Sequence, residues 1–118
     1  MFDTRQIARA CHIGEPAIRQ WLSRSPGIAI GSINGHARTY NEFDAMTIVI
    51  AAEMLRHRLG RPHECLPIAQ AIADQTGTMW ACRPHGGDIV ITADRPDCVA
   101  IAIPLDFLRS RLATIPAK

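Results

Sequence analysis

Apolar residues near the start of the chain recur at helical spacing in two short runs on either side of a tight turn. The segment 7–21, IARACHIGEPAIRQW, has a small residue where two helices can cross closely, and apolar residues that can face inward on both helices and in the turn. These residues are Ala8, Ile13, Ile18 and Trp21. The pattern predicts a first helix that is capped at Asp3 or Thr4 and ends near Cys11. A second helix is expected to start at Gly14 and to stop at Ser25-Pro26-Gly27.

Two strand-like runs and a long helix follow. Ile28 to Ile30 and Ala37 to Tyr40 are separated by a Gly31, Asn34 and Gly35 turn region, which predicts a β-hairpin. Asn41 is placed to cap a helix over Glu42–Leu59, which Gly60 and Pro62 would end. The apolar residues of this helix occupy more than one face, so we expect the C-terminal half or a second subunit to cover it.

The pattern changes after residue 61. Pro67 is expected in the first turn of a short helix that ends at Gly77, because apolar residues follow it at helical spacing. Strands are predicted over 79–83, 89–92 and 98–103, with turns at 85–88 and 94–97, and a final helix from about Leu105 to Leu112. In the last strand, Val99, Ile101 and Ile103 should share one face, while Cys98, Ala100 and Ala102 form the other.

Together these elements predict an α+β fold with a helix-turn-helix and a wing-sized hairpin at residues 1–61. A small antiparallel β-sheet with flanking helices is expected at residues 62–118. The chain of 118 residues is 47% hydrophobic, enough for a packed core, which excludes a disordered chain.

Charge is divided unevenly between the two parts. Residues 1–61 hold eight arginines and five acidic residues, a balance of +3, whereas residues 62–118 hold five basic and six acidic residues, a balance of −1. Twelve of the thirteen basic residues are arginine, whose planar guanidinium suits phosphate oxygens and guanine edges. The first part therefore has the charge that a nucleic-acid-binding region needs.

The cysteines and the apolar segments indicate a cytoplasmic protein. Cys11, Cys65, Cys82 and Cys98 form no CxxC pair, so we expect four reduced core residues. Asp3, Arg5 and Arg9 interrupt the start of the chain, so no secretory signal is expected there. The segment from Ala45 to Leu55 is too short for a bilayer and contains Glu53, so no membrane contact is expected.

Two sets of chemically reactive residues are close in sequence but do not predict a site. His57, His63 and Cys65 have no recognised metal-ligand spacing, and Pro62 breaks the helix between them. Cys82, His85 and Asp88 lie around a turn, where adjacency is no sign of convergence in a cleft. We therefore expect no metal, no cofactor and no enzymatic activity.

The first half resembles the N-terminal DNA-binding domain of MerR-type regulators. The matching elements are Ile18-Arg19-Gln20-Trp21 on the second helix, Arg38-Thr39-Tyr40 in the hairpin, and Leu55-Arg56 through Leu59-Gly60 at the end of the long helix. Three features depart from the family pattern. His12 stands where the turn usually has glycine, Gln20 replaces the first aromatic residue, and Glu15-Pro16-Ala17 replaces the polar and basic start of the recognition helix.

The resemblance implies a winged helix-turn-helix that binds double-stranded DNA. Arg19, Gln20 and Arg24 would face the major groove, and Arg38 and Tyr40 would grip the phosphate backbone, although Tyr40 is equally compatible with a packed ring. The expected function is a transcriptional regulator, in the simplest case a repressor, that binds as a homodimer paired through its C-terminal half. Two alternatives remain. One is an excisionase-like architectural factor of a mobile element, and the other is an adaptor that has lost DNA binding and captures a protein partner through its C-terminal half.

Overall fold

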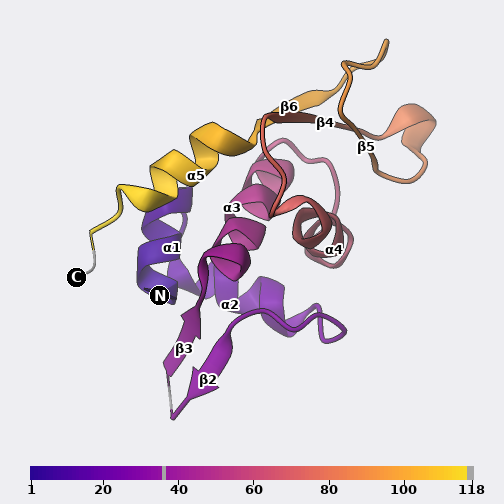
Figure 1. Cartoon of the computed structure of the whole chain (residues 1–118). Coiled ribbons are helices and arrows are strands. Elements are labelled where there is room, and N and C mark those ends of the chain that lie inside the picture. Colours follow the sequence, from indigo (N-terminus) through magenta and orange to yellow (C-terminus); the bar gives the residue numbers. More distant parts are fainter. Residues whose placement is uncertain (36, 117–118) are drawn as a thin grey trace.

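The computed structural model describes residues 1–35 and 37–116, which form an α+β structure with two small antiparallel sheets (Figure 1). The elements are β1 (Phe2–Asp3), α1 (Thr4–Cys11), α2 (Glu15–Ser23), β2 (Ser32–Asn34), β3 (Ala37–Tyr40), α3 (Glu42–Arg56), α4 (Pro62–Ile72), β4 (Thr78–Cys82), the 3₁₀ turn η1 (Pro84–Gly86), β5 (Val90–Thr92), β6 (Ile101–Pro104) and α5 (Leu105–Ala113). Within the described residues, no helix has both the length and the apolar composition needed to cross a bilayer.

The two predicted N-terminal helices form where the sequence places them. Asp3 caps α1 by accepting a hydrogen bond from the Gln6 N–H at 2.8 Å, and the Gln6 side chain accepts one from the Asp3 N–H at 2.8 Å. His12 ends α1 with a left-handed backbone at φ 57°, a conformation in which glycine is favoured and histidine is tolerated. The Ile13 N–H then returns to the Ala8 carbonyl at 3.0 Å, which fixes the turn into α2.

The hairpin differs from the sequence-based expectation in its first strand. Ile28–Ile30 was the predicted strand, but β2 begins only at Ser32. Ile30 is 2% exposed and is part of the core, and Gly31 turns the chain at φ 78°. β3 forms as predicted and lies in the middle of a three-stranded sheet of order β1-β3-β2. The short strand β1 was not predicted, because two residues carry no alternation from which a strand can be read.

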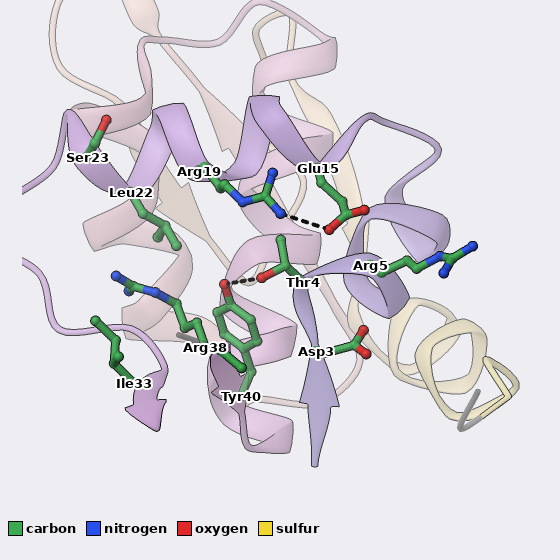
Figure 2. Close-up of a pocket in the computed structure, with 11 residues that line it drawn as sticks. Asp3, Thr4, Arg5, Glu15, Arg19, Leu22, Ser23, Ile33, Arg38 and Tyr40 are labelled. Atoms are coloured by element: carbon green, nitrogen blue, oxygen red, sulfur yellow. Dashed lines mark hydrogen bonds and ion pairs between the residues drawn. The ribbon is translucent and has the colours of Figure 1, made fainter. Parts of the chain in front are cut away.

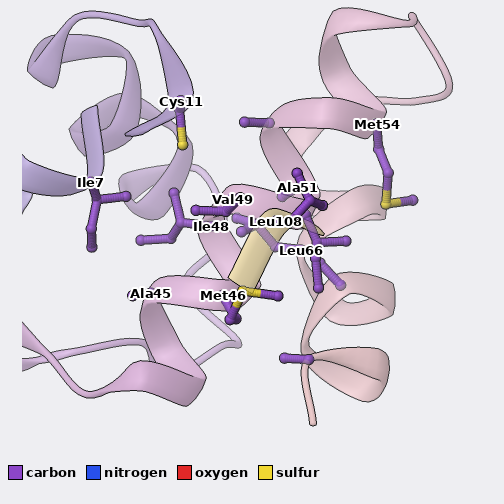
Figure 3. Packing of buried hydrophobic residues seen from close by; sticks show 14 of the residues in the cluster. Ile7, Cys11, Ala45, Met46, Ile48, Val49, Ala51, Met54, Leu66 and Leu108 are labelled. Atoms are coloured by element: carbon purple, nitrogen blue, oxygen red, sulfur yellow. The ribbon is translucent and has the colours of Figure 1, made fainter. Parts of the chain in front are cut away.

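α3 is the central helix of the molecule. Nine of its fifteen residues are buried, including Met46, Ile48, Val49 and Met54. α1 packs on one side of α3, and α4 and α5 pack around the others (Figures 1 and 3). Of the two covers expected for α3, the C-terminal half or a second subunit, the structure shows the C-terminal half. The hydrophobic core therefore runs across residue 61, the expected boundary between the two parts.

α3 ends at Arg56, three residues before the predicted end, because Arg58 takes a left-handed conformation at φ 56°. The Leu59 N–H then donates to the Met54 carbonyl at 3.0 Å and closes the helix. Glycine normally occupies such a position, since any side chain there crowds the backbone.

We expect Arg58→Gly to stabilise the fold by about 0.5–1 kcal/mol, because Arg58 is exposed and its backbone strain would be relieved. The midpoint of urea unfolding should rise. Arg9→Gly is the matched control, because it places the same change inside α1 and should instead cost about 1 kcal/mol. A lower midpoint for Arg58→Gly would contradict the backbone assignment.

α4 starts at Pro62, so the expected start at Pro67 is wrong and Pro67 lies inside the helix. Pro62 has the fixed φ that suits a first helical residue, and the Arg61 N–H is satisfied by the Glu64 carboxylate at 3.0 Å. Pro67 removes only one internal hydrogen bond, to the carbonyl of His63 in the first turn. α4 also ends at Ile72, earlier than the predicted Gly77.

The second sheet has the order β5-β4-β6. Its last strand starts at Ile101, not at the predicted Cys98, so Val99 does not share a face with Ile101 and Ile103 and is instead 97% exposed. The expectation that all four cysteines are core residues is also wrong for Cys98, which is exposed in the same irregular segment. From Ile101 onward the predicted alternation holds, with Ile103 buried and Ala102 exposed.

Arg83 connects three parts of the chain: the residues that follow α3, helix α4 and the β4–β5 connection. Its guanidinium donates to the Glu64 carboxylate at 2.7 Å, to the Leu59 carbonyl at 3.0 Å and to the Gly87 carbonyl at 2.7 Å. The hydrogen bonds from Arg83 and from the Arg61 N–H lower the pKa of Glu64 to about 2.

The pKa of Glu64 is lower in the folded chain than in the unfolded chain, so its contribution to stability is present above about pH 4.5 and is lost as the pH falls toward 2. We expect Glu64→Gln to lose less unfolding free energy than the wild type between about pH 5 and 2. Denaturant titrations at several pH values measure this difference. Asp97→Asn, an exposed carboxylate change, is the control. Parallel acid profiles for wild type and Glu64→Gln would rule out the role of this ion pair.

Candidate functional site

A groove of about 600 Å³ lies between α2 and the β2–β3 hairpin. The N-terminal end of α1 forms its third side (Figure 2). The lining residues are Asp3, Thr4, Arg5, Glu15, Arg19, Leu22, Ser23, Ile33, Ala37, Arg38 and Tyr40. Three of the five predicted site residues, Arg19, Arg38 and Tyr40, are brought together here from two separate elements.

Arg19 lies on the α2 wall of the groove. Its side chain is 64% exposed, and its Nη2 donates to the Glu15 carboxylate one turn earlier at 3.0 Å (Figure 2). Such an exposed pair at i and i+4 contributes little to stability, about 0.3–0.5 kcal/mol, so an external anion can displace Glu15 at low cost. Arg19 is therefore available to an anionic ligand.

Arg38 lies on the hairpin wall. Its Nη1 donates to the Ile30 carbonyl at 2.8 Å, which holds the guanidinium at the base of the hairpin. Arginine has five N–H donors, so the remaining ones can bind a second group. Ile33, 69% exposed on the paired strand opposite Arg38, gives this wall an apolar part.

Tyr40 lines the groove but is almost completely buried. The residue is 1% exposed, and its hydroxyl shares a hydrogen bond of 3.0 Å with the Thr4 hydroxyl (Figure 2). Of the two roles that the sequence leaves open for Tyr40, the structure shows the packed ring. The hydrogen bond with Thr4 ties β3 to the start of α1 and so fixes the angle between the hairpin and the helix pair.

Gln20 and Arg24 are exposed but do not line the groove. Gln20 lies on α2 beside Arg19, and Arg24 caps the C-terminal end of α2. Both residues therefore lie on the part of the α2 surface that is outside the groove.

Arg5 and Thr4 are groove residues that the sequence did not single out. They reach the groove because β1 pairs with β3, with Phe2 opposite Tyr40 and Asp3 opposite Thr39. No local sequence signal reveals this pairing. Three arginines, Arg5, Arg19 and Arg38, line the groove together with Asp3 and Glu15, and Asp3 is already engaged as the cap of α1.

The two other sets of reactive residues do not converge in the described part of the chain. Residues 1–35 and 37–116 contain no group of three or more His, Cys, Asp and Glu side chains placed to hold a metal ion. Cys82 is buried in β4, whereas His85 and Asp88 are exposed in the turn beyond it.

Comparison of the sequence with models of protein families returns no match, and neither does comparison with curated proteins.

Proposed function

We propose that this chain binds double-stranded DNA through α2 and the β2–β3 hairpin and acts as a transcriptional regulator in the cytoplasm. The observation that carries the proposal is the placement of Arg19 and Arg38 on facing walls of one groove, beside the exposed surface of α2. A helix with side chains is about 10–12 Å wide, and the major groove of B-DNA is about 12 Å wide.

The exposed surface of α2 has the spacing of a helix face. Pro16, Arg19, Gln20 and Ser23 are exposed, while Ile18 is buried. With this face in the major groove, Arg19 and Gln20 would reach base edges, and Arg24 would lie near the backbone at the end of the helix. The hairpin, with Arg38, would then lie against the flanking phosphates, which set position and affinity without reading sequence.

The proposal includes repression through occupancy of a promoter by a homodimer. α3 is covered by α4 and α5 of its own chain, so pairing would use another surface. The exposed apolar residues of the C-terminal half, Val90, Val99 and Phe107, provide candidates for it. One copy contacts only a short stretch of DNA. A dimer would bind DNA more tightly than one copy and would favour a two-fold symmetric site.

One observation favours the adaptor alternative. Arg19 and Arg38 each have a partner within the chain, the Glu15 carboxylate and the Ile30 carbonyl. A surface whose cations are already paired can bind a protein through complementary shape, whereas phosphate binding needs free positive charge. The two functions differ in their salt dependence, because only DNA binding by these arginines releases counterions from a polyanion.

Selection of bound fragments from genomic DNA tests the proposal. If the protein is a transcriptional regulator, the selection should recover a few fragments that overlap promoters and share a sequence motif. Closely spaced multiple sites that bend strongly and lie away from promoters would support the excisionase-like architectural factor instead. Recovery no better than that of a protein-free control would count against both.

Glu15→Gln should raise the affinity for DNA by about three- to tenfold, because it removes a carboxylate that repels phosphate and releases Arg19 from its 3.0 Å ion pair. Fluorescence anisotropy with a labelled duplex measures the change. Glu42→Gln is the matched control, since Glu42 is also in the first turn of a helix but lies outside the groove. Equal affinities for Glu15→Gln and the wild type would show that Glu15 does not restrain binding.

A further inference from the structure

β6 forms a free edge of the second sheet. The strand order β5-β4-β6 gives β6 a strand neighbour on one side only within residues 1–35 and 37–116. A strand edge presents unpaired backbone N–H and C=O groups, to which a strand of another chain can bind. Figure 1 shows β6 at the end of the molecule away from the β2–β3 hairpin. A chain that pairs with β6 would therefore leave the groove between α2 and the hairpin open.

The hydrogen-bonding pattern of the sheet shows which backbone groups of β6 face this edge. The Leu105 N–H donates to the Gly77 carbonyl at 2.9 Å, directly beyond the last pair of β4 and β6. In an antiparallel ladder, every second residue of a strand bonds to the neighbouring strand, so Ile103 and Ile101 continue the series that starts at Leu105. The N–H and C=O of Ala102, between them, therefore point away from β4.

Ala102 is the position at which two copies can pair. Ala102 and Pro104 are the residues of β6 that face the free edge, and proline has no N–H to donate. The Ala102 side chain is small and exposed, so it leaves room for a strand beside it. If two identical strands lie antiparallel about a two-fold axis at Ala102, the N–H of each Ala102 donates to the carbonyl of the other.

Charge favours the β6 edge over the β5 edge. A surface that binds a copy of itself must be complementary to itself. Residues 98–105, which include β6, contain no charged side chain. Asp88 and Asp94, in contrast, lie just outside the two ends of β5. Antiparallel pairing of two copies at β5 would bring these carboxylates toward each other, which is unfavourable.

The carboxylates nearest to residues 98–105 have arginines of the same chain beside them. Asp97 and Arg95 line one surface hollow of about 550 Å³. On the other side of β6, the Asp106 carboxylate lies 3.5 Å from the Arg109 guanidinium. Two copies can therefore approach each other at β6 without bringing unbalanced charges together.

Exposed apolar side chains lie before and after β6 in the chain. Val99, which is 97% exposed, precedes the strand, and Phe107, which is 61% exposed, follows it in the first turn of α5. In an antiparallel pair, the residues before the strand in one copy lie on the same side as the residues after it in the other. A two-fold axis at Ala102 would therefore bring Val99 toward Phe107 of the second copy and remove both from water.

We propose that two copies of this chain pair through β6, antiparallel about a two-fold axis at Ala102, and so form one continuous sheet of six strands. The strand order is β5-β4-β6 in one copy, followed by β6-β4-β5 in the other. This proposal rests on the homodimer that the proposed function includes, and it specifies the surface that forms the dimer.

Sedimentation equilibrium of the full chain without DNA measures the pairing, and the wild type is expected to be a dimer. Ala102→Pro should raise the dissociation constant of the dimer at least about tenfold, because each copy loses the N–H that it donates to the other. This N–H does not bond to β4, and proline is tolerated at such positions of edge strands, so the fold of each copy should be kept.

A charge exchange tests whether residue 102 meets itself across the axis. Ala102→Lys and Ala102→Glu should each weaken the dimer about three- to tenfold, because like charges then lie directly opposite each other. An equimolar mixture of the two variants should form a heterodimer that is tighter than either homodimer. Val90→Lys and Val90→Glu are the matched controls, since Val90 is exposed on β5, the other edge strand of the sheet. Both should dimerise like the wild type.

A wild type that stays monomeric at about 100 μM would overturn the proposal. So would a mixture of the Ala102→Lys and Ala102→Glu variants that is no tighter than the separate variants, and this test still decides if the proline variant does not fold. The result is also distinct from the test of DNA binding. A monomer that binds DNA would contradict only the pairing at β6, whereas a β6-paired dimer that binds no DNA would contradict only the proposed DNA site.

Discussion

Arg19→Ala combined with Arg38→Ala is expected to lower the affinity for double-stranded DNA by about a hundredfold, with about tenfold from each change. Each arginine contributes a charge-assisted contact from one wall of the groove, and the two walls belong to different elements. The Arg38 change should weaken binding about equally for all sequences, whereas the Arg19 change should also relax sequence preference. Anisotropy titrations with a selected duplex and a scrambled duplex measure both effects.

Arg95→Ala is the control for charge alone, because it removes one arginine from the β5–β6 connection, which does not line the groove, and should change the affinity by less than about threefold. The melting temperatures of all variants must stay close to that of the wild type, since Arg38 also holds the Ile30 carbonyl. An unchanged affinity in the folded double variant would show that this groove is not where DNA binds.

A chain that ends at residue 61 is expected not to fold, even though the residues proposed to bind DNA all lie within it. α3 packs against α4 and α5, so truncation would expose most of one side of a helix whose buried residues form the centre of the core. Circular dichroism and denaturant titration should show a non-cooperative chain. A cooperative transition of the fragment would show that residues 1–61 are an independent domain.

Leu66→Ala tests the same dependence in the full chain. Leu66 is fully buried on α4 and belongs to the core cluster that includes residues of α1 and α3. The change should cost about 2–5 kcal/mol in a single transition that unfolds both parts together. Leu22→Ala, at a partly exposed position on the groove, should cost less. Separate transitions for the two halves would contradict a shared core.

The elements with strong local signals could be predicted from the sequence. α1, α2 and α3 carry side-chain or proline signals at their starts, such as Asp3, Asn41 and the early Pro16, and the structure places the helices there. The errors fall where tertiary contacts outweigh local pattern. Ile28–Ile30 has strand-like residues, yet Ile30 is drawn into the core and β2 starts later. The run 98–100 is apolar, yet the strand pairs with β4 only from Ile101.

The site could be predicted only in part, for a similar reason. Arg19 and Arg38 are visible as cations on a helix and a hairpin, but their convergence depends on the bond between Tyr40 and Thr4 and on the pairing of β1 with β3. Both contacts join residues that are far apart in sequence. The Glu15–Arg19 pair follows from their spacing of four residues on one helix, but the contact of Arg38 with the Ile30 carbonyl depends on how the hairpin folds back.

Binding of DNA by the groove arginines can be measured by a salt titration with a short duplex of random sequence, because this needs no knowledge of the operator. We expect binding at low salt, with a logarithm of the affinity that falls linearly with the logarithm of the salt concentration. Arg38→Ala should make that slope shallower by about 1. Absence of binding by the wild type at about 50 mM salt, or a slope that Arg19→Ala and Arg38→Ala both leave unchanged, would contradict it.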